Sequence, residues 1–223
     1  MTDSKRMRVA VVGLGWMGRV HLRNYSQMPK VDVVGVMDTN EEVLETVANE
    51  FDVPTFTDID PLLDQGLDAL SICVPTIHHQ NLAMKAIERS IPLLVEKPLA
   101  ATVEEGRNLV ETAKQRGVPL MVGHIERFNP AVQRVAQLLD GDDQIISIMI
   151  ERVGPYPPRI QDVGVVRDLA SHDIDLCCHL SGSRYRDICA FTSRNIGEHE
   201  DTVVISGEMD NGVEFRHAGA CVQ

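Results

Sequence analysis

The segment Gly13-Leu14-Gly15-Trp16-Met17-Gly18 matches the pattern G-x-G-x-x-G and constrains the fold more than any other feature. It follows the apolar run 8–12, which is typical of a buried strand, and it opens a helical pattern over 16–28. In such a unit the first glycine makes a tight turn, the second lets backbone approach a diphosphate, and the third packs helix against strand. We therefore expect Gly13, Gly15, Trp16, Met17 and Gly18 to contact a dinucleotide at the start of a helix; a purely structural turn is the alternative.

Strand and helix patterns alternate through the first half of the chain. This alternation predicts a doubly wound parallel sheet, with an α/β Rossmann domain over residues 1–123. Asn40 and Thr102 precede acidic residues as N-caps, and Gly117 is placed to end a helix. The expected strands are 31–37, 69–74, 92–95 and 119–122, and the expected helices are 41–51, 79–89 and 103–116.

The pattern changes after Gly123, and residues 124–223 predict an α+β domain with a mostly antiparallel open sheet. Two strand-like runs flank Asp210-Asn211-Gly212, a turn typical of a hairpin. The chain stops soon after the second run, so we expect either a missing C-terminal part or a subunit that covers the sheet. The other expected elements are helices over 130–139 and 168–180, a strand over 144–153 and a proline-rich loop over 154–158; the hairpin strands are 202–209 and 213–217.

Composition excludes several classes of protein. The 223 residues carry a net charge of −12, which argues against sequence-independent binding to nucleic acid. We find no apolar run of the length that a membrane span requires and no signal-peptide cleavage site, so we expect a cytoplasmic protein. The five cysteines show no paired spacing and predict reduced thiols. Neighbouring His and Cys residues lack the spacing of zinc ligands, so no metal is expected.

Asp38 ends the second predicted strand, 20 residues after Gly18. A carboxylate at this place can accept hydrogen bonds from the adenosine ribose, whereas a 2′-phosphate would meet a like charge. Because Thr39-Asn40 supplies no arginine, the sequence predicts NAD in preference to NADP. The alternative is that Asp38 serves only as a turn residue.

Two further motifs carry groups that could do chemistry. Glu96-Lys97-Pro98 follows the fourth strand, at the edge where open α/β sheets bind ligands; a solvated lysine is the alternative. Asp168, His172 and Asp175 are spaced i, i+4, i+7, which places them on one face of a helix. Carboxylates near a histidine favour its protonated form and suit an acid/base group, whereas a surface ion cluster is the alternative.

Together these motifs resemble the glucose-fructose oxidoreductase/inositol dehydrogenase/rhizopine-catabolism (Gfo/Idh/MocA) oxidoreductases. They occur in family order and span residues 7 to about 180. The resemblance implies an N-terminal Rossmann domain and a C-terminal domain whose open sheet often mediates oligomers, here a dimer or tetramer. It also implies NAD(P)-dependent oxidation of a sugar or cyclitol hydroxyl to a ketone.

The resemblance also assigns roles by position. Lys97 corresponds to the active-site lysine, His172 to the acid/base and Asp168 to the carboxylate beside it, so all three would contact substrate. Cys73-Val74-Pro75-Thr76, with His79 beyond, matches the loop that borders the nicotinamide, so Pro75, Thr76 and His79 would bind cofactor with Glu96 and Lys97. The peptide before Pro98 is often cis in such proteins. Ala170 stands where the family usually has glycine, and family members usually extend beyond Gln223.

Residues 122–130 resemble a segment of UDP-N-acetylglucosamine 3-dehydrogenase-like members, which suggests a nucleotide-sugar substrate. Arg127 and Asn129 could face the substrate, and Arg159 and Arg167 could contact its diphosphate. A structural or solvated role is the alternative for all four.

We therefore expect an NAD-dependent dehydrogenase that oxidises a secondary sugar hydroxyl, at C3 of a nucleotide sugar such as UDP-N-acetylglucosamine. An inositol 2-dehydrogenase or simple-sugar dehydrogenase is the first alternative. A non-catalytic NAD(P)-binding regulator, or an inactive fragment of a longer enzyme, is the second.

Overall fold

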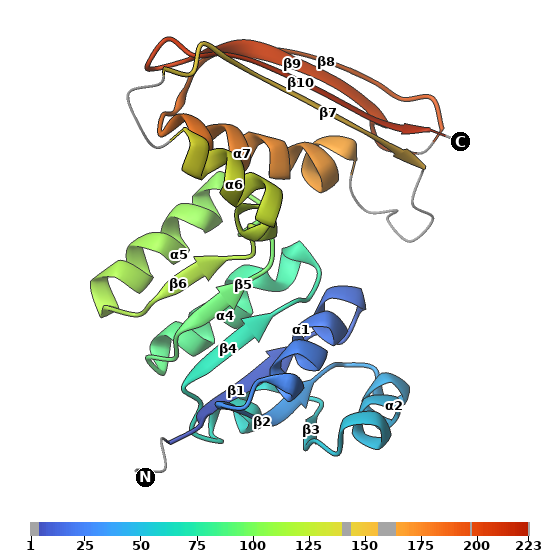
Figure 1. Ribbon diagram of the computed structural model, residues 1–223. Helices are drawn as coiled ribbons and strands as arrows, with labels where there is room; N and C mark the ends of the chain where they lie inside the picture. The colour runs from blue at the N-terminus through green and yellow to red at the C-terminus, as the bar shows by residue number, and fades with distance from the viewer. Residues whose placement is uncertain (1–4, 140–143, 156–163, 197, 223) are drawn as a thin grey trace. The chain divides into compact units, whose positions relative to one another are not determined.

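A computed structural model of the chain describes residues 5–139, 144–155, 164–196 and 198–222 (Figure 1). By its internal contacts the chain divides into two compact units, Met1–Gly123 and His124–Gln223. Each unit has its own sheet and its own buried core. Within the described residues we find no helix with the length and apolar character needed to cross a membrane.

The first unit contains a parallel six-stranded sheet in the order β3-β2-β1-β4-β5-β6. The order runs outward in both directions from β1 and β4, which confirms the predicted doubly wound sheet. Only β3 was not predicted, since a two-residue strand leaves no periodic pattern. The strands are β1 (Met7–Val12), β2 (Val31–Met37), β3 (Thr55–Phe56), β4 (Ala69–Ile72), β5 (Leu93–Val95) and β6 (Leu120–Val122).

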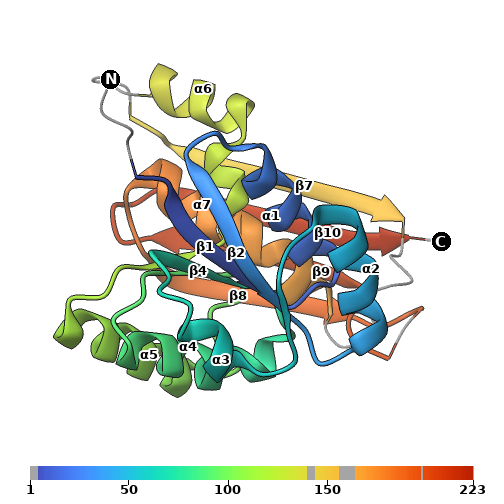
Figure 2. The ribbon, with the colours of Figure 1, turned by 90° about the horizontal axis from the view of Figure 1, so that it is seen from below.

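Helices cover both faces of this sheet. Figure 2 shows α1 (Trp16–Gln27) and α2 (Glu41–Phe51) on one face, and α3 (Ile59–Leu63), α4 (His79–Glu88) and α5 (Val103–Arg116) on the other. Successive residues of a strand point to opposite faces, so one apolar run supplies both cores. Val11 joins the core beneath α1 and α2, whereas its neighbours Ala10 and Val12 join the core of the opposite face.

The predicted caps are present. The Asn40 side chain accepts hydrogen bonds from the N–H groups of Glu42 and Val43 at the start of α2. Thr102 forms a capping box with Glu105 at the start of α5, and Gly117 ends that helix with a φ of 66°. Each cap satisfies backbone groups that the helix itself leaves unpaired, which explains why these boundaries could be placed from sequence.

The second unit contains a four-stranded sheet in the order β7-β10-β9-β8. Strand β10 pairs with β9 antiparallel through the predicted hairpin, whose Gly212 has a φ of 85°, and with β7 in parallel. Strand β8 pairs with β9 antiparallel, so the mostly antiparallel sheet is confirmed. The strands are β7 (Ser147–Pro155), β8 (Tyr185–Ser193), β9 (Thr202–Met209) and β10 (Glu214–Val222).

Two expectations about this sheet were wrong. Strand β8 was not predicted, because this edge strand is exposed along almost its whole length and lacks an alternating apolar pattern. Gly154 and Pro155, expected in a loop, belong to β7, which pairs with β10 as far as Pro155; the rest of the expected loop, 156–158, lies outside the described residues. A proline is tolerated there because β7 lies at the edge of the sheet.

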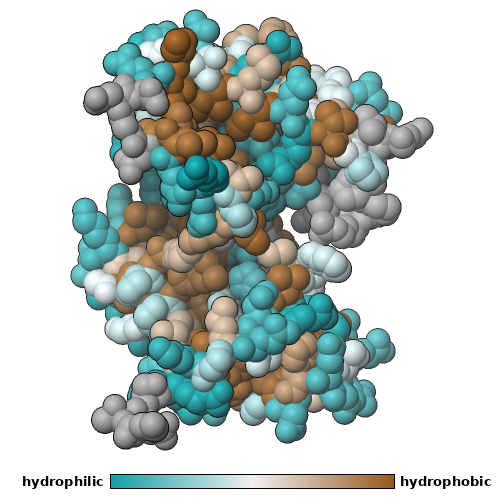
Figure 3. Space-filling model, viewed as in Figure 1, coloured by the Kyte–Doolittle hydropathy of each residue, from teal (hydrophilic) through white to brown (hydrophobic). Residues whose placement is uncertain are grey.

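One helix covers one face of this sheet. The segment η3 (Val166–Ala170) has π-helical hydrogen bonding and continues into α7 (Ser171–Ser181), so the helix predicted over 168–180 begins with a wider turn. Apolar residues of η3, α7, β9 and β10 form the core. The opposite face carries exposed side chains, and Figure 3 shows hydrophobic residues interspersed with hydrophilic ones on this unit. The remaining elements are η1 (Thr76–His78), η2 (Ile125–Phe128) and α6 (Pro130–Leu138).

Candidate cofactor and active-site residues

The glycine turn between β1 and α1 has the shape of a diphosphate cradle. Gly13 has a φ of +86°, and a Cβ there would lie 2.7 Å from the Val74 nitrogen. A Cβ at Gly18 would lie 1.7 Å from the Gly13 oxygen, so helix and turn are in close contact. A Cβ at Gly15 would meet no described atom within 4 Å. Gly13 and Gly18 are therefore required by packing, while Gly15, the N-cap of α1, leaves backbone N–H groups open to an anion.

Residues on either side of this turn are accessible. Trp16, the first residue of α1, is 68% exposed, and Met17 is half-buried. Pro75 is exposed and Thr76 is half-buried at the start of η1, after the carboxyl end of β4. Because β1 and β4 are adjacent and parallel, both segments follow the same edge of the sheet. These four residues can therefore contact one ligand at that edge.

Asp38, directly after β2, connects this strand to the glycine turn. One carboxylate oxygen accepts a hydrogen bond from the Leu14 N–H at 2.7 Å, and the other accepts one from the Asn40 N–H at 3.0 Å. Asp38 therefore does serve as a turn residue, the role considered as the alternative to ribose binding. Each oxygen keeps a further lone pair, so the same carboxylate can also accept a ribose hydroxyl.

His79 is buried and ties together two loops at the sheet edge. Its Nδ1 lies 3.0 Å from the Pro98 carbonyl oxygen and its Nε2 lies 2.9 Å from the Val74 carbonyl oxygen. Both ring nitrogens thus lie within hydrogen-bond distance of a backbone carbonyl oxygen. With 1% of its surface exposed, His79 supports the loops and does not present its ring to a ligand.

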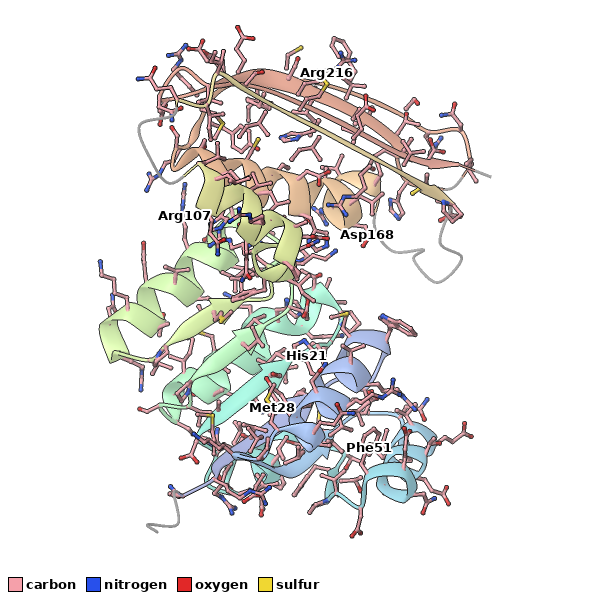
Figure 4. The ribbon with its side chains drawn as sticks, in the orientation of Figure 1. His21, Met28, Phe51, Arg107, Asp168 and Arg216 are labelled. Carbon is pink, nitrogen blue, oxygen red and sulfur yellow. The ribbon has the colours of Figure 1, made fainter. Side chains whose placement is uncertain are left out.

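The Glu96-Lys97-Pro98 turn follows β5, and its Lys97–Pro98 peptide is cis, as the resemblance implied. The Glu96 carboxylate lies 3.0 Å from the Nε2 atom of His21, on α1 (Figure 4). His21 was not among the residues that the sequence motifs predicted. Its position three residues after Gly18, on the helix that the glycine turn opens, is the signal that could have indicated it.

In the second unit, Asp168 lies on η3 (Figure 4) and His172 lies on α7. Both residues are half-buried. The π-helical turn lies where the predicted acid/base pair begins. Such turns are uncommon in helices and are frequent at functional sites.

Asp175, the third residue of the motif, has a structural role. Its carboxylate accepts two hydrogen bonds from the Arg127 guanidinium, at 2.8 and 2.5 Å, and lies 3.6 Å from the Nε2 atom of His124. The Asp175 hydrogen bonds raise the pKa of Arg127 above its usual value. This pair joins α7 to η2, so the expected contact of Arg127 with substrate stays a prediction.

The other predicted substrate residues have local roles or lie outside the described residues. The Asn129 side chain accepts the Ala131 N–H at 3.0 Å as the N-cap of α6 and donates to Glu126 at 3.1 Å. Arg167 is exposed on η3. Arg159 lies outside the described residues. The substrate contacts of these residues remain predictions.

A buried ion network in this unit was not apparent from the sequence. Asp173 is 1% exposed and accepts hydrogen bonds from two nitrogens of Arg152, at 3.1 and 2.9 Å. Arg152 also lies 3.5 Å from Glu126. The network joins α7, β7 and η2 next to His172, through residues that are far apart in the sequence.

Two of the five cysteines are held as thiols by burial. All five are unbridged. Burial raises the pKa of the Cys73 thiol and, for Cys177, raises it to about 11, so both remain protonated near neutrality. Among the described residues, no group of three or more His, Cys, Asp or Glu side chains is arranged to hold a metal ion.

Comparison with known proteins places both units in one family. Residues 7–124 match the oxidoreductase family with an NAD-binding Rossmann fold, and residues 145–219 match the C-terminal domain of Gfo/Idh/MocA proteins. These matches confirm the expectation of an NAD-binding Rossmann fold.

Individual relatives act on several sugars and cyclitols. The chain is 34% identical over 206 residues to UDP-N-acetylglucosamine 3-dehydrogenase from Acidithiobacillus ferrooxidans, covering 92% of this chain and 64% of that protein. It is 31% identical over 193 residues to a scyllo-inositol 2-dehydrogenase (NAD(+)) from Bacillus subtilis, covering 82% and 56%. The chain thus spans less than two thirds of the length of these curated relatives.

Solved structures agree with this comparison. A structure of the Acidithiobacillus enzyme, GnnA, matches with a TM-score of 0.90 at 32% identity, covering 98% of this chain and 68% of that chain. GenD2 from gentamicin A biosynthesis, solved in complex with NAD, matches with a TM-score of 0.91 at 26% identity, covering 100% and 68%.

Proposed function

The chain belongs to the Gfo/Idh/MocA oxidoreductase family, and from that membership we propose that it oxidises a secondary hydroxyl of a sugar to a ketone with NAD. We propose C3 of a nucleotide sugar, such as UDP-N-acetylglucosamine, as the position oxidised. The observation that carries this proposal is the 34% identity to a UDP-N-acetylglucosamine 3-dehydrogenase over 92% of the chain. Identity of 31% to a scyllo-inositol 2-dehydrogenase supports a cyclitol as the second candidate substrate.

The first unit fits the cofactor. The open backbone at Gly15 and the N-terminus of α1 would hold the diphosphate, and Asp38 would accept the ribose hydroxyls. Pro75, Thr76, Glu96 and Lys97 follow neighbouring strands and would border the nicotinamide. Bound NAD supplies the carbon that accepts hydride.

The proposal assigns the proton chemistry to three residues. His172 accepts the proton of the substrate hydroxyl, because an imidazole exchanges protons near neutrality. Lys97 stabilises the negative charge that develops on the substrate oxygen. Asp168, four residues before His172, orients the site. Arg127, Asn129, Arg159 and Arg167 remain proposed substrate contacts.

A substrate panel tests the proposal. UDP-sugars, inositols and free sugars are each incubated with the protein and NAD, and NADH absorbance is followed. We expect reduction of NAD with UDP-N-acetylglucosamine at higher kcat/KM than with any cyclitol. Turnover with inositols alone would favour the second candidate. Binding of NAD without turnover of any of these compounds would favour a non-catalytic role.

We also propose that the open face of the second sheet binds a second copy of the chain. Phe191 on β8 and Val204 on β9 are opposed across the strands, and their exposed fractions are 71% and 39%. Arg216 (Figure 4) and Glu214, two residues apart on β10, supply opposite charges on the same face. Two copies related by a two-fold axis can pair these charges reciprocally. Sedimentation should show a dimer or tetramer that Phe191→Lys weakens; a wild-type monomer at micromolar concentration would exclude this interface.

A further inference from the structure

One face of α1 lies against the parallel sheet of the first unit. Its members are Gly18, His21, Leu22 and Tyr25, whose spacing of three and four residues places them on one side of a helix. An added Cβ at Gly18 would lie 3.5 Å from the Cβ atom of Cys73, and Leu22 is fully buried in the core on this side of the sheet. The remaining two members, His21 and Tyr25, are polar.

Both polar side chains bind the sheet. The Nε2 atom of His21 lies 3.0 Å from the carboxylate of Glu96, directly after β5, and each of these side chains is 12% exposed. The Tyr25 hydroxyl lies 2.7 Å from the hydroxyl of Ser71, a buried residue of β4. Apolar contacts tolerate a small slide of one surface along another, whereas a hydrogen bond weakens steeply when its distance or angle changes. These two contacts therefore fix the position of α1 along its own axis.

The Glu96 carboxylate is itself held in place. Its backbone N–H donates to the Ile72 carbonyl at 2.9 Å, one carboxylate oxygen accepts the backbone N–H of Lys97 at 3.3 Å, and an added Cβ at Gly123 would lie 2.8 Å from the carboxylate. Burial alone would raise the pKa of Glu96, but the hydrogen bond and charge of His21, with smaller contributions from Lys97, lower it. Glu96 is therefore an anion that can only accept, so the Nε2 atom of His21 donates the hydrogen bond.

The position of α1 matters at its first turn. There the backbone N–H groups and the positive end of the helix dipole would meet the diphosphate of the dinucleotide. His21 lies six residues after Gly15, about 9 Å along the helix axis, and is one turn nearer to this end than Tyr25. A slide of the helix would lengthen the hydrogen bonds to the diphosphate, whereas the contacts of Asp38 with the adenosine ribose come from a different element.

We propose that His21 is a positioning residue for the cofactor: its hydrogen bond to Glu96 fixes α1 against the end of β5 and so keeps the N-terminus of α1 within reach of the diphosphate. Loss of this contact should weaken the part of the binding that depends on the diphosphate and spare the part that depends on adenosine. The inference rests on the NAD-binding fold and goes beyond the proposed function, since it does not depend on which sugar is oxidised.

Two probes separate these parts in the full chain. ADP-ribose carries the diphosphate but no nicotinamide, so it does not report on a contact of Glu96 with that ring, and adenosine carries neither group. The Kd of ADP-ribose is measured by calorimetry and that of adenosine by NMR titration. In His21→Leu we expect the Kd of ADP-ribose to rise about tenfold, which corresponds to roughly 1.4 kcal/mol, and that of adenosine to stay within about twofold. His21→Gln keeps a hydrogen-bond donor and should recover most of the affinity for ADP-ribose.

A double variant tests whether the two residues act through one contact. With the imidazole absent, the carboxylate no longer acts on α1, so His21→Leu/Glu96→Gln should bind ADP-ribose no more weakly than His21→Leu. A further loss of about tenfold in the double variant would show that His21 and Glu96 act separately, and would overturn the proposal.

Tyr25→Phe is the matched control, because it removes the other hydrogen bond between α1 and the sheet. Its melting temperature should fall while the affinities for both probes stay as in the wild type. A selective loss of ADP-ribose as large as in His21→Leu, or equal losses of both probes in His21→Leu, would overturn the proposal. If His21→Leu does not fold, His21→Asn decides, because its amide is too short to reach Glu96: it should show the selective loss, and wild-type affinities would refute the role of His21. The titrations need no sugar, so this proposal and the proposed substrate fail separately.

Discussion

The Asp38 carboxylate accepts a hydrogen bond from the backbone N–H of Leu14 at 2.7 Å, and so connects the end of β2 to the glycine turn. One side chain therefore shapes the turn and carries the negative charge that would oppose a 2′-phosphate. This double role has a measurable consequence for the choice of cofactor.

We expect Asp38→Ala to weaken NAD binding by about tenfold or more, because a hydrogen bond to a charged group contributes roughly 1.5–3 kcal/mol. The ratio of NADP to NAD affinity should rise, since the repelling charge is gone. Calorimetric titration of both nucleotides measures this. Asp32→Ala, on the strand that ends just before Asp38 and paired at the surface with Arg6, is the control and should change neither affinity. An unchanged ratio in Asp38→Ala would contradict the role of the carboxylate.

Gly15 and Gly18 provide a matched pair of substitutions. Gly15→Ala adds a methyl group where no described atom lies within 4 Å, so thermal stability should be preserved while NAD affinity falls. Gly18→Ala places its Cβ 1.7 Å from the Gly13 oxygen, so the turn must move and stability should fall by about 1–3 kcal/mol. Melting curves and nucleotide titrations of both variants separate packing from ligand approach. Equal effects on stability would refute this distinction.

His172→Ala should reduce kcat by roughly 10²–10⁴-fold, the usual contribution of a positioned acid/base group. The Kd for NAD should not change, because the proposed nucleotide contacts lie in the first unit. Steady-state kinetics on the active sugar, with a parallel NAD titration, gives both values. His179→Ala, an exposed histidine at the end of the same helix, serves as the control. Full turnover in His172→Ala would remove it from the proposed mechanism.

Arg127→Lys tests whether this arginine supports the fold or binds substrate. Lysine cannot form the bidentate hydrogen bond that Arg127 donates to the Asp175 carboxylate. Because this carboxylate is buried, the second unit should lose about 1–2 kcal/mol of stability. The loss is modest because the Arg127 side chain is 42% exposed and solvent screens the ion pair. Urea unfolding measures this loss. An increase in substrate KM without a change in stability would instead favour the substrate contact.

His217 predicts a pH dependence of the second unit. It is 1% exposed and 3.0 Å from the Tyr185 hydroxyl, and burial lowers its pKa, partly opposed by the charge of Asp173. Below about pH 6.5 the unfolded chain therefore binds a proton that the folded chain resists. The associated stability is present above that pH and is lost as the pH falls through the folded-state pKa.

Urea midpoints between pH 8 and pH 5 should decline for the wild type and decline less for His217→Gln. His199→Gln, at an exposed position, should follow the wild type. Identical slopes for all three proteins would show that His217 does not contribute.

The helices and strands that a local sequence pattern determines could be predicted, and those that depend on distant residues could not. The helices with caps at Asn40 and Thr102 begin where expected, because capping is decided by residues a few positions apart. Strand β8 was missed because its own residues show no strand pattern. Its pairing with β9 makes it a strand.

The residues of the candidate site divide in the same way, into those that a local pattern predicts and those that only tertiary contacts bring together. The glycine turn and Asp38 could be placed because their spacing is fixed by a single βαβ unit. The link between Arg127 and Asp175 spans 48 residues, and that between His21 and Glu96 spans 75, so no local pattern reveals either. Asn129, read as a substrate contact, caps α6 through the Ala131 N–H only two residues further on, so here a local pattern was available.

The position of β10 between β7 and β9 has a consequence for biosynthesis. During translation β7 is synthesised before the strand that pairs with it. That strand, β10 (Glu214–Val222), is its only partner in the described sheet and is made some sixty residues later. Until then the backbone N–H and C=O groups of β7 are unpaired and can pair with a strand of another nascent chain. The strands of the first sheet are complete at Val122 and can pair before β7 is made, whereas the second sheet must wait for β10.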